Sequence, residues 1–401
     1  MPDVMQNVRR HHHHHRPLVT VAAALAATLL VTSCGADPGG GPPPEPAGSS
    51  VGAHGRLDIP PAAPLRTGER FVHLEMARPY RPSAPNGGTD EYRCFLVDPG
   101  LTEQAYLTGS QFLPQNAGMV HHAIFFRLDP ADAAPARRLD AETPGDGWTC
   151  FGNAGIGDAS WVAHWAPGAD ETLLSPGLGY PMPPGSQLVM QVHYNLIDVR
   201  AGVDDTDRSG IRLRLVDGSG AVEPLVTELL PAPVELPCAA DERGELCDRG
   251  AAVRDVRRRF GAEAGEEAEQ LNAYCNRGRA PVPGNIQHCD HPVTAAGLVH
   301  AAAGHMHLLG SAIKVELNPG TPEARTLLDI PAYDFDEQAN RPLPQPVAVE
   351  PGDVYRVTCT HDVTLRKRVP QLRNLPPRYV VWGEGTSDEM CLGLIVMSRP
   401  D

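Results

Sequence analysis

The sequence is poor in several features that would assign it to a familiar class. Aromatic residues make up only 5% of its 401 residues, and no Cys-x-x-Cys pair supports a zinc ribbon or a thioredoxin-like motif. A formal net charge of −15 argues against binding to nucleic acid or another polyanion. The chain instead has 41% hydrophobic residues with 40 glycines and 41 prolines, which favours short strands joined by turns over helical bundles.

The beginning of the chain is typical of an export signal. Three arginines precede an apolar run over residues 18–31, which is too short to span a bilayer and suits a signal peptide. The run ends in Val-Thr-Ser-Cys at residues 31–34, which resembles the lipobox of bacterial lipoproteins. The resemblance implies removal of residues 1–33 and lipid attachment to Cys34. Ordinary secretion with an incidental cysteine is the alternative.

The residues after Cys34 predict an anchored body in an oxidising compartment. Residues 34–56 are mostly Gly, Pro, Ala and Ser and predict a flexible tether. An even number of cysteines remains, which suits disulfide pairing: Cys94, Cys150, Cys238, Cys247, Cys275, Cys289, Cys359 and Cys391. We therefore expect a monomeric body that is held by a lipid anchor to a membrane of the bacterial cell envelope.

The rest of the chain is predicted to be all-β, in two halves. Strands are predicted over residues 90–97, 119–128, 186–196 and 211–216, and then over 298–315 (broken at glycines), 354–360, 379–382 and 390–397. The turn sequence Asp-Gly-Ser-Gly at 217–220 predicts domains over residues 57–217 and 218–401. One stretch, 251–274, has helical spacing and predicts a small disulfide-pinned helical insertion at about 238–291.

A first candidate metal site begins at the adjacent pair His121 and His122. Successive residues of a regular strand point to opposite faces, so both can reach one metal only at a strand end or a bulge. His193 shares a strand face with Gln191, which is a candidate for orienting the His193 ring. Three neutral imidazoles suit copper or zinc better than magnesium or calcium. The alternative is that His121 and His122 are unrelated surface and core residues.

A second candidate site combines His305 and His307 with the later Met390. Two histidines two residues apart project to the same side of a strand and can chelate one ion. A methionine thioether is a soft, weak ligand that favours Cu(I). The alternative is that Met390 is core packing, with Met306 and Met397 as equal competitors for the ligand role. Two copper centres with unlike ligands indicate redox chemistry more than structural metal binding.

The segments VHHAIFF, LVMQVHYN, GHMHLLG and SDEMCLGLIVM resemble, in this order, the copper type II, ascorbate-dependent monooxygenases. This is the family of the peptidylglycine α-hydroxylating and dopamine β-monooxygenases, and the resemblance covers about residues 88–398. It implies two copper ions per chain. The electron-transfer copper would be held by His121, His122 and His193. The oxygen-binding, substrate-side copper, where the catalysis occurs, would be held by His305, His307 and Met390.

The resemblance also implies a fold and one disulfide. The fold is two tandem antiparallel β-sandwich (jelly-roll-like) domains, with an open cleft between the two metals. The disulfide joins Cys359 and Cys391. The family's partner for Cys94 is absent, because Arg208 stands near the place where that cysteine is expected. A Cys94–Cys150 bond is therefore a guess, as is pairing among the cysteines of the insertion.

The implied activity is hydroxylation of an unactivated C–H bond of a small organic substrate, with O2 and a reductant such as ascorbate. Peptide-hydroxylating members hold the substrate carboxylate with an Arg, an Asn and a Tyr, where this chain has Ala303, Leu392 and Leu394. Their loss argues against a C-terminal peptide and favours a more apolar substrate, such as a small aromatic or an amine. A copper-binding or copper-delivery protein without turnover, and a structural β-sandwich adhesin, are the alternatives.

Overall fold

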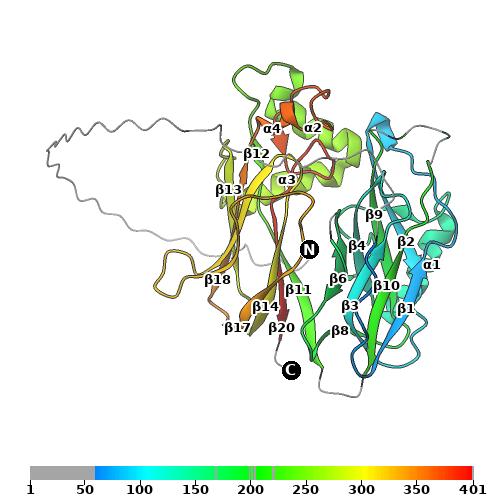
Figure 1. Cartoon of the computed structure of the whole chain (residues 1–401). Coiled ribbons are helices and arrows are strands. Elements are labelled where there is room, and N and C mark those ends of the chain that lie inside the picture. Colours follow the sequence, from blue (N-terminus) through cyan, green and yellow to red (C-terminus); the bar gives the residue numbers. More distant parts are fainter. Residues whose placement is uncertain are drawn as a thin grey trace, which may run out of the picture. The chain divides into compact units, whose positions relative to one another are not determined.

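The structure is a computed structural model that describes residues 59–167, 169–197, 199, 202, 205–218 and 222–399. The predicted signal peptide, the lipidation site Cys34 and the tether over residues 34–56 lie outside the described residues. Strands dominate the described part of the chain (Figure 1). None of its helices combines the length and the apolar character needed to cross a membrane.

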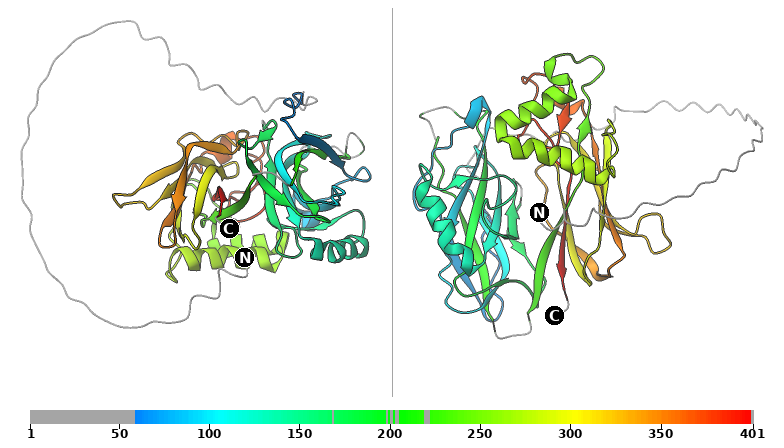
Figure 2. Two further views of the ribbon diagram at one scale, coloured as in Figure 1. Left: turned by 90° about the horizontal axis from the view of Figure 1, so that it is seen from below. Right: turned by 180° about the vertical axis from the view of Figure 1, so that it is seen from behind.

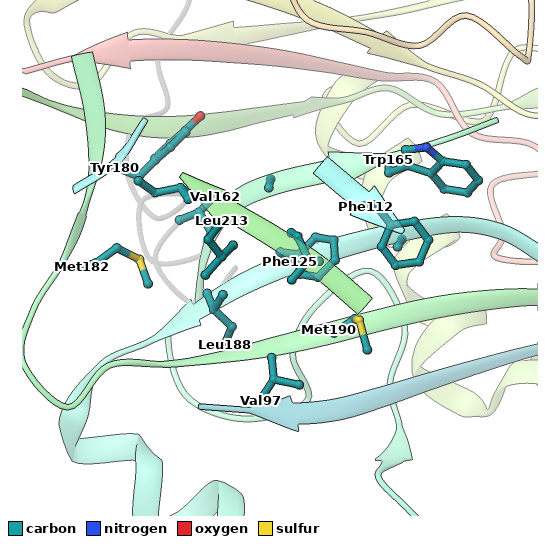
Figure 3. Close-up of a cluster of buried hydrophobic side chains, with 14 of the residues drawn as sticks. Val97, Phe112, Phe125, Val162, Trp165, Tyr180, Met182, Leu188, Met190 and Leu213 are labelled. Carbon is teal, nitrogen blue, oxygen red and sulfur yellow. The ribbon is translucent and has the colours of Figure 1, made fainter. Parts of the chain in front are cut away.

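The first half of the described chain forms two sheets that enclose an apolar core. One sheet has the order β1 (Glu69–Glu75), β10 (Gly210–Asp217), β3 (Ala105–Leu113), β8 (Leu178–Met182), with β7 (Thr172–Leu173) paired to β3. The other has the order β5 (Trp148–Thr149), β2 (Asp90–Val97), β9 (Gln187–Asn195), β4 (Val120–Leu128), β6 (Ser160–Trp165). Phe125, Met190 and Leu213 lie in the core between them (Figure 3).

The second half repeats this arrangement with its own core. One sheet has the order β11 (Glu223–Pro231), β20 (Leu392–Ser398), β14 (Gly297–His305), β17 (Arg341–Val349). The other has the order β13 (Ile286–Pro292), β18 (Val354–His361), β15 (Gly310–Leu317), β16 (Arg325–Ile330). The short strands β12 (Glu235–Leu236) and β19 (Val380–Val381) pair separately. Val299, Val315 and Ile395 belong to the core of this half.

These sheets confirm the all-β fold with two sandwich domains. Nearly all strand pairs are antiparallel, but β8 and β11 pair in parallel at Leu178–Glu223 and Gly179–Pro224. That short parallel contact, which the sequence did not predict, joins one sheet of each half into a single nine-stranded sheet. Because this sheet runs through both halves, the exact domain boundary at residue 217 stays a prediction.

The predicted helical insertion consists of two helices, α2 (Arg249–Phe260) and α3 (Ala262–Cys275), after the 3-10 turn η4 (Glu245–Cys247). Figure 2 shows the two helices together at one end of the strands. The Asp248 side chain accepts a hydrogen bond from the Ala251 amide and caps α2. Gly261, at φ 96°, separates the two helices. The insertion is shorter than predicted, because residues 286–291 belong to β13.

Buried Glu235 of β12 fastens the insertion to the second half. Its carboxylate accepts hydrogen bonds from Arg249 at 2.6 and 2.7 Å, from Asn272 at 2.7 Å and from the Tyr379 hydroxyl at 2.8 Å. Because a buried carboxylate is costly unless it is fully paired, this set fixes where α2 and α3 lie. The insertion also contacts the first half, where the Phe260 and Phe151 rings pack edge to face.

Several strands, among them β1, β3, β8, β11, β13 and β17, were not predicted from the sequence, and neither were four short helices and turns. These four are helix α1 (Ala133–Glu142), helix α4 (Leu365–Arg368) and the 3-10 turns η2 (Pro85–Gly87) and η3 (Pro130–Asp132). All four connect strands. None of them supplies a residue of the two predicted metal sites.

Candidate metal centre

The three histidines of the first cluster meet at one point. β4 pairs with β9, and the register shifts between Val120 and His122, so His121 is an extra residue at a bulge. The Nδ1 atom of His193 lies 3.1 Å from Nδ1 of His121 and 3.4 Å from Nδ1 of His122. The potential ligand atoms of the three rings all lie within 4.8 Å of one another. The predicted strand irregularity therefore brings the adjacent histidines and His193 together.

The ring of His193 is held from β2, and Asp90 is the residue that holds it. Asp90 Oδ1 lies 3.0 Å from His193 Nε2, and both side chains are buried. The carboxylate accepts, so the ring proton is on Nε2 and the Nδ1 lone pair faces the other two histidines. Tyr92, which pairs with His193 across β2 and β9, stacks on the ring with centroids 4.0 Å apart.

The predicted role of Gln191 is wrong. Its amide donates to the Asn153 carbonyl at 3.0 Å and to Cys150 Sγ at 3.4 Å, and it forms no hydrogen bond with His193. Gln191 lies opposite Cys94 on the sheet, two pairs further along than His193 and Tyr92. It therefore belongs to the surroundings of the Cys94–Cys150 disulfide.

Burial keeps the imidazoles of the first cluster neutral. It lowers the pKa of His121 and His122 well below the ordinary value, and the neighbouring imidazoles lower each pKa further. Burial also lowers the pKa of His193, against the opposing effect of Asp90. For Asp90 itself, burial alone would raise the pKa, but hydrogen bonds from His193 and two threonines hold it well below its usual range. Neutral imidazole is the form that binds a metal.

The second cluster lies where β14 ends. His305 is the last residue of the strand, and His307 lies two residues beyond its end. The prediction that both side chains project from one regular strand is therefore wrong. Their rings are nevertheless close, with centroids 5.2 Å apart. Burial and the neighbouring His307 lower the pKa of His305 to about 3. The strand end, rather than strand parity, brings the two rings together.

Hydrogen bonds leave the Nε2 atoms of this pair free for a metal. His305 Nδ1 lies 2.6 Å from Gln338 Oε1, and the Gln338 amide nitrogen donates to the Phe335 carbonyl, which fixes the amide's orientation. His307 Nδ1 donates to the Asp388 carbonyl at 3.3 Å. His307 Nε2 is buried and has no hydrogen-bond partner among the described residues. Burying a nitrogen without a hydrogen-bond partner costs free energy of folding, and a bound metal would remove that cost.

The backbone brings Met390 alongside this pair. His305 pairs with Leu392 across β14 and β20, so continuing that antiparallel register places Met390 opposite His307. The Glu389 carboxylate accepts from the backbone amides of His307 at 2.8 Å and Met390 at 3.1 Å and ties the two segments together. Met390 is buried in an apolar cluster that includes Ala303 and Leu394. Its role as a sulfur ligand stays a prediction.

The two clusters adjoin each other. The rings of His122 and His305 meet edge to face with centroids 5.5 Å apart. Phe335 stacks on His121 at 4.6 Å, and the Gln338 carbonyl lies 3.3 Å from Nε2 of His164 in β6. The open cleft that the resemblance implies is therefore not present between these rings.

The disulfides agree with the implied pairing and settle the open ones. Cys359 and Cys391 form a disulfide, and Cys391 is the residue that follows Met390 in the chain. The guess of Cys94–Cys150 is confirmed. Within the insertion the bonds join the following pairs: Cys238–Cys247 and Cys275–Cys289.

The donors of both clusters fit copper. The first cluster offers three imidazole Nδ1 atoms, and its one carboxylate, that of Asp90, is engaged by His193 Nε2 rather than turned to the shared point. The second offers two imidazole Nε2 atoms, and the strand register places Met390 opposite His307. Imidazole and thioether donors suit copper, whereas magnesium and calcium require oxygen. The buried Nε2 of His307, which has no hydrogen-bond partner among the described residues, is a position that a bound metal would satisfy.

Comparisons with known proteins confirm the resemblance. Residues 284–397 match the family described as copper type II ascorbate-dependent monooxygenase, C-terminal domain. A human protein named DBH-like monooxygenase protein 2 is 25% identical over 309 residues, which is 75% of this chain and 52% of that protein. The chain thus spans about half the length of this curated relative. Both comparisons thus support a resemblance to the copper type II, ascorbate-dependent monooxygenases.

Solved structures add little to this assignment. The capsid protein P2 of bacteriophage PM2 is 6% identical and covers 83% of this chain and 98% of its own, with a TM-score of 0.29. An allantoicase structure is 9% identical and covers 83% of this chain and 90% of its own, with a TM-score of 0.20. Likenesses of this degree carry no argument about function.

Proposed function

We propose that this protein is a copper-dependent monooxygenase that hydroxylates a C–H bond of a small organic substrate. The observation that carries the proposal is the pair of adjoining imidazole clusters with different surroundings. One has three rings, and the other has two rings on a backbone segment whose register places Met390 opposite His307. Bound copper would supply one-electron redox chemistry and the activation of dioxygen. The balanced reaction takes the C–H substrate, O2, two electrons and two protons to the alcohol and water.

The two sites would have different tasks because their supports differ. His121, His122 and His193 would hold one copper through Nδ1, in a site that is held rigidly by Asp90 and Tyr92. His305, His307 and Met390 would hold the other. A weak thioether permits an open coordination position and a change of oxidation state with little rearrangement. The second site therefore suits the reaction with O2, and the first suits storage and transfer of an electron.

The substrate would lie against the apolar cluster around Met390. Besides Met390, that cluster contains Ala303, Trp382, Leu392, Leu394 and residues of α3. The three positions where peptide-hydroxylating relatives hold a carboxylate are thus part of one apolar surface here, which supports a small, largely apolar substrate. The Trp382 indole Nε1 is buried without a partner among the described residues, so it is available to donate to a substrate acceptor.

Turnover with isotopically labelled dioxygen tests the proposal. Purified, copper-loaded protein is supplied with ascorbate and a panel of small aromatic compounds and amines, and products are analysed by mass spectrometry. We expect one labelled oxygen atom in the hydroxylated product and a dependence on reductant. Copper binding with no labelled product from any compound would favour the copper-delivery alternative.

We also propose that Cys34 anchors the protein to a bacterial cell membrane through a lipid. The lipobox-like residues 31–34 and the apolar run before them support this location. Expression in a bacterial host followed by membrane fractionation tests it. The protein should be in the membrane fraction and the Cys34→Ala variant should not be processed to that form. An unlipidated mature protein would contradict the anchor.

A further inference from the structure

One short segment, residues 383–389 between β19 and β20, contacts both histidine clusters. It precedes Met390 directly in the chain. Its backbone and side chains form hydrogen bonds to the supports of His193 on one side and to His307 on the other. It is therefore placed to make one metal site depend on the other.

The side chain of Thr386 is the main link to the first cluster. Its hydroxyl donates to Asp90 Oδ1 at 2.5 Å and accepts from the Asn195 amide at 2.9 Å. Its backbone amide lies 3.3 Å from the same carboxylate oxygen. Thr386 is 1% exposed and Asp90 4% exposed, so no solvent can replace these bonds without rearrangement. A buried residue of the C-terminal half thus fixes the position of a buried carboxylate of the N-terminal half.

Asp90 passes that constraint on to the metal site. The oxygen that accepts from Thr386 is the same oxygen that accepts from His193 Nε2. The direction of this second bond sets the ring proton and turns Nδ1 toward His121 and His122. If Asp90 were free to rotate, His193 would lose both its fixed tautomer and its fixed orientation.

A second link runs through Tyr92. Its hydroxyl donates to the Glu384 backbone carbonyl at 2.5 Å, and its ring stacks on His193. At the other end of the segment, the Asp388 carbonyl accepts from His307 Nδ1, and the Glu389 carboxylate accepts from the His307 amide. The segment is thus hydrogen-bonded to His307 directly and to His193 through Asp90, while Tyr92 links it to the ring stack on His193.

We propose that Thr386 is a positioning residue of the three-histidine site, and that residues 383–389 couple metal binding at the two sites. The inference rests on the metal sites of the proposed function. A metal bound by His307 and Met390 restrains the segment from its far end, and the restrained segment holds Asp90 and His193 in the binding geometry. Because coupling between binding sites is reciprocal, each metal raises the affinity of the other site.

Cu(I) affinity of the full chain, measured by competition with a chromophoric chelator, tests the proposal. The His307→Ala background isolates the three-histidine site. In that background Thr386→Val should weaken Cu(I) binding by about 10- to 100-fold, the usual effect of losing an outer support of a ligand. Thr386→Ser, which keeps the hydroxyl, should bind like its parent. The Cu(II) EPR spectrum should change in Thr386→Val and be restored in Thr386→Ser.

Thr108→Val is the matched control, because Thr108 is also buried and donates its hydroxyl to a carboxylate, that of Glu69 at 2.7 Å. It should leave Cu(I) affinity unchanged. For the coupling, Met390→Ala should weaken the three-histidine site when Thr386 is present and not when Val replaces it.

Three outcomes would overturn the proposal: unchanged affinity in Thr386→Val, equal losses in the Val and Ser variants, or an equal loss in Thr108→Val. Each of these can occur in a protein that still hydroxylates a substrate, so the proposed function would survive it. Conversely, coupled binding without any turnover would leave the positioning role standing and remove the enzymatic one.

Discussion

The imidazole rings of His122 and His305 are in edge-to-face contact, although β4 in the first half carries one and β14 in the second half carries the other. The contact joins the two predicted metal sites without an intervening side chain. Phe335 of the second half stacks on His121 of the first half and forms another contact between the two clusters. Metal ions bound at the two clusters should therefore interact electrostatically and magnetically.

This contact predicts magnetic interaction between two bound Cu(II) ions. Dipolar coupling between paramagnetic ions falls steeply with distance, so ions held by touching rings broaden each other's EPR lines. We expect the two-copper protein to give a broadened spectrum that does not equal the sum of its single sites. The single-site spectra come from His307→Ala and His193→Ala protein loaded with one equivalent of Cu(II).

A two-copper spectrum equal to that sum would contradict the prediction. It would mean that the clusters move apart when metal binds. Repeating the measurement with the diamagnetic Zn(II) in one site provides the control, because the broadening should then disappear.

Removal of His193 should cost the protein one copper of two. His193 is the ring at which the other two Nδ1 atoms converge, and two imidazoles alone form a much weaker site. We expect His193→Ala to retain about one copper per chain, measured by elemental analysis after dialysis against a weak chelator. His73→Ala, on β1 and outside both clusters, should retain two. Loss of both coppers or of neither in His193→Ala would refute the assignment of separate sites.

Strand positions in this chain were predictable because alternation and turn residues are local properties. The predicted strand 90–97 coincides with β2. The strand predicted over 119–128 differs from β4 by one residue at one end, and that over 186–196 differs from β9 by one residue at each end. The parallel contact of β8 with β11 was not predictable, because pairing between distant strands leaves no local signal. Helix α1 was missed because its alanines and arginines occur in a short connection between strands.

The ligands could be found from sequence, whereas their supports could not. The two histidine pairs can be recognised directly in the sequence, and the family resemblance assigned the remaining ligand to each pair. The supports Asp90 and Tyr92 reach His193 because β2 pairs with β9 in a particular register. Thr386 reaches Asp90 from a loop almost 300 residues away in the sequence. The spacing of residues along the chain indicates neither contact. Gln191 was chosen as the support of His193 because it shares the strand face, but it lies two residues away along the strand.

The buried ion cluster behind the second site should be important for stability. Arg259 of α2 contacts Asp388 at 2.6 Å and Asp255 at 2.8 Å, and Arg378 contacts the same two carboxylates. Removing one cation leaves buried negative charge only partly compensated, which typically costs about 3–5 kcal/mol. We expect Arg259→Met to lower the free energy of unfolding of metal-free protein by about this amount, measured in urea.

Arg257→Met is the control for that variant. Arg257 lies on the exposed side of the same helix, and exposed substitutions usually change stability by less than about 0.5 kcal/mol. If both variants were equally stable, the ion cluster would contribute little, and Arg378 together with Arg258 would suffice to neutralise Asp388 and Asp255.

Trp382 should tolerate the loss of its indole nitrogen better than other buried tryptophans. Its Nε1 is buried without a partner among the described residues, so Trp382→Phe removes a group that costs free energy in the unliganded protein. Trp165 is buried to a similar extent, but its Nε1 donates to the Ala169 carbonyl at 2.9 Å. Since both changes remove similar volume, Trp165→Phe should be more destabilising by about 1 kcal/mol, the usual contribution of one hydrogen bond. Urea unfolding of both metal-free variants measures the difference, and an equal or larger loss in Trp382→Phe would show that its nitrogen is already satisfied in the free protein.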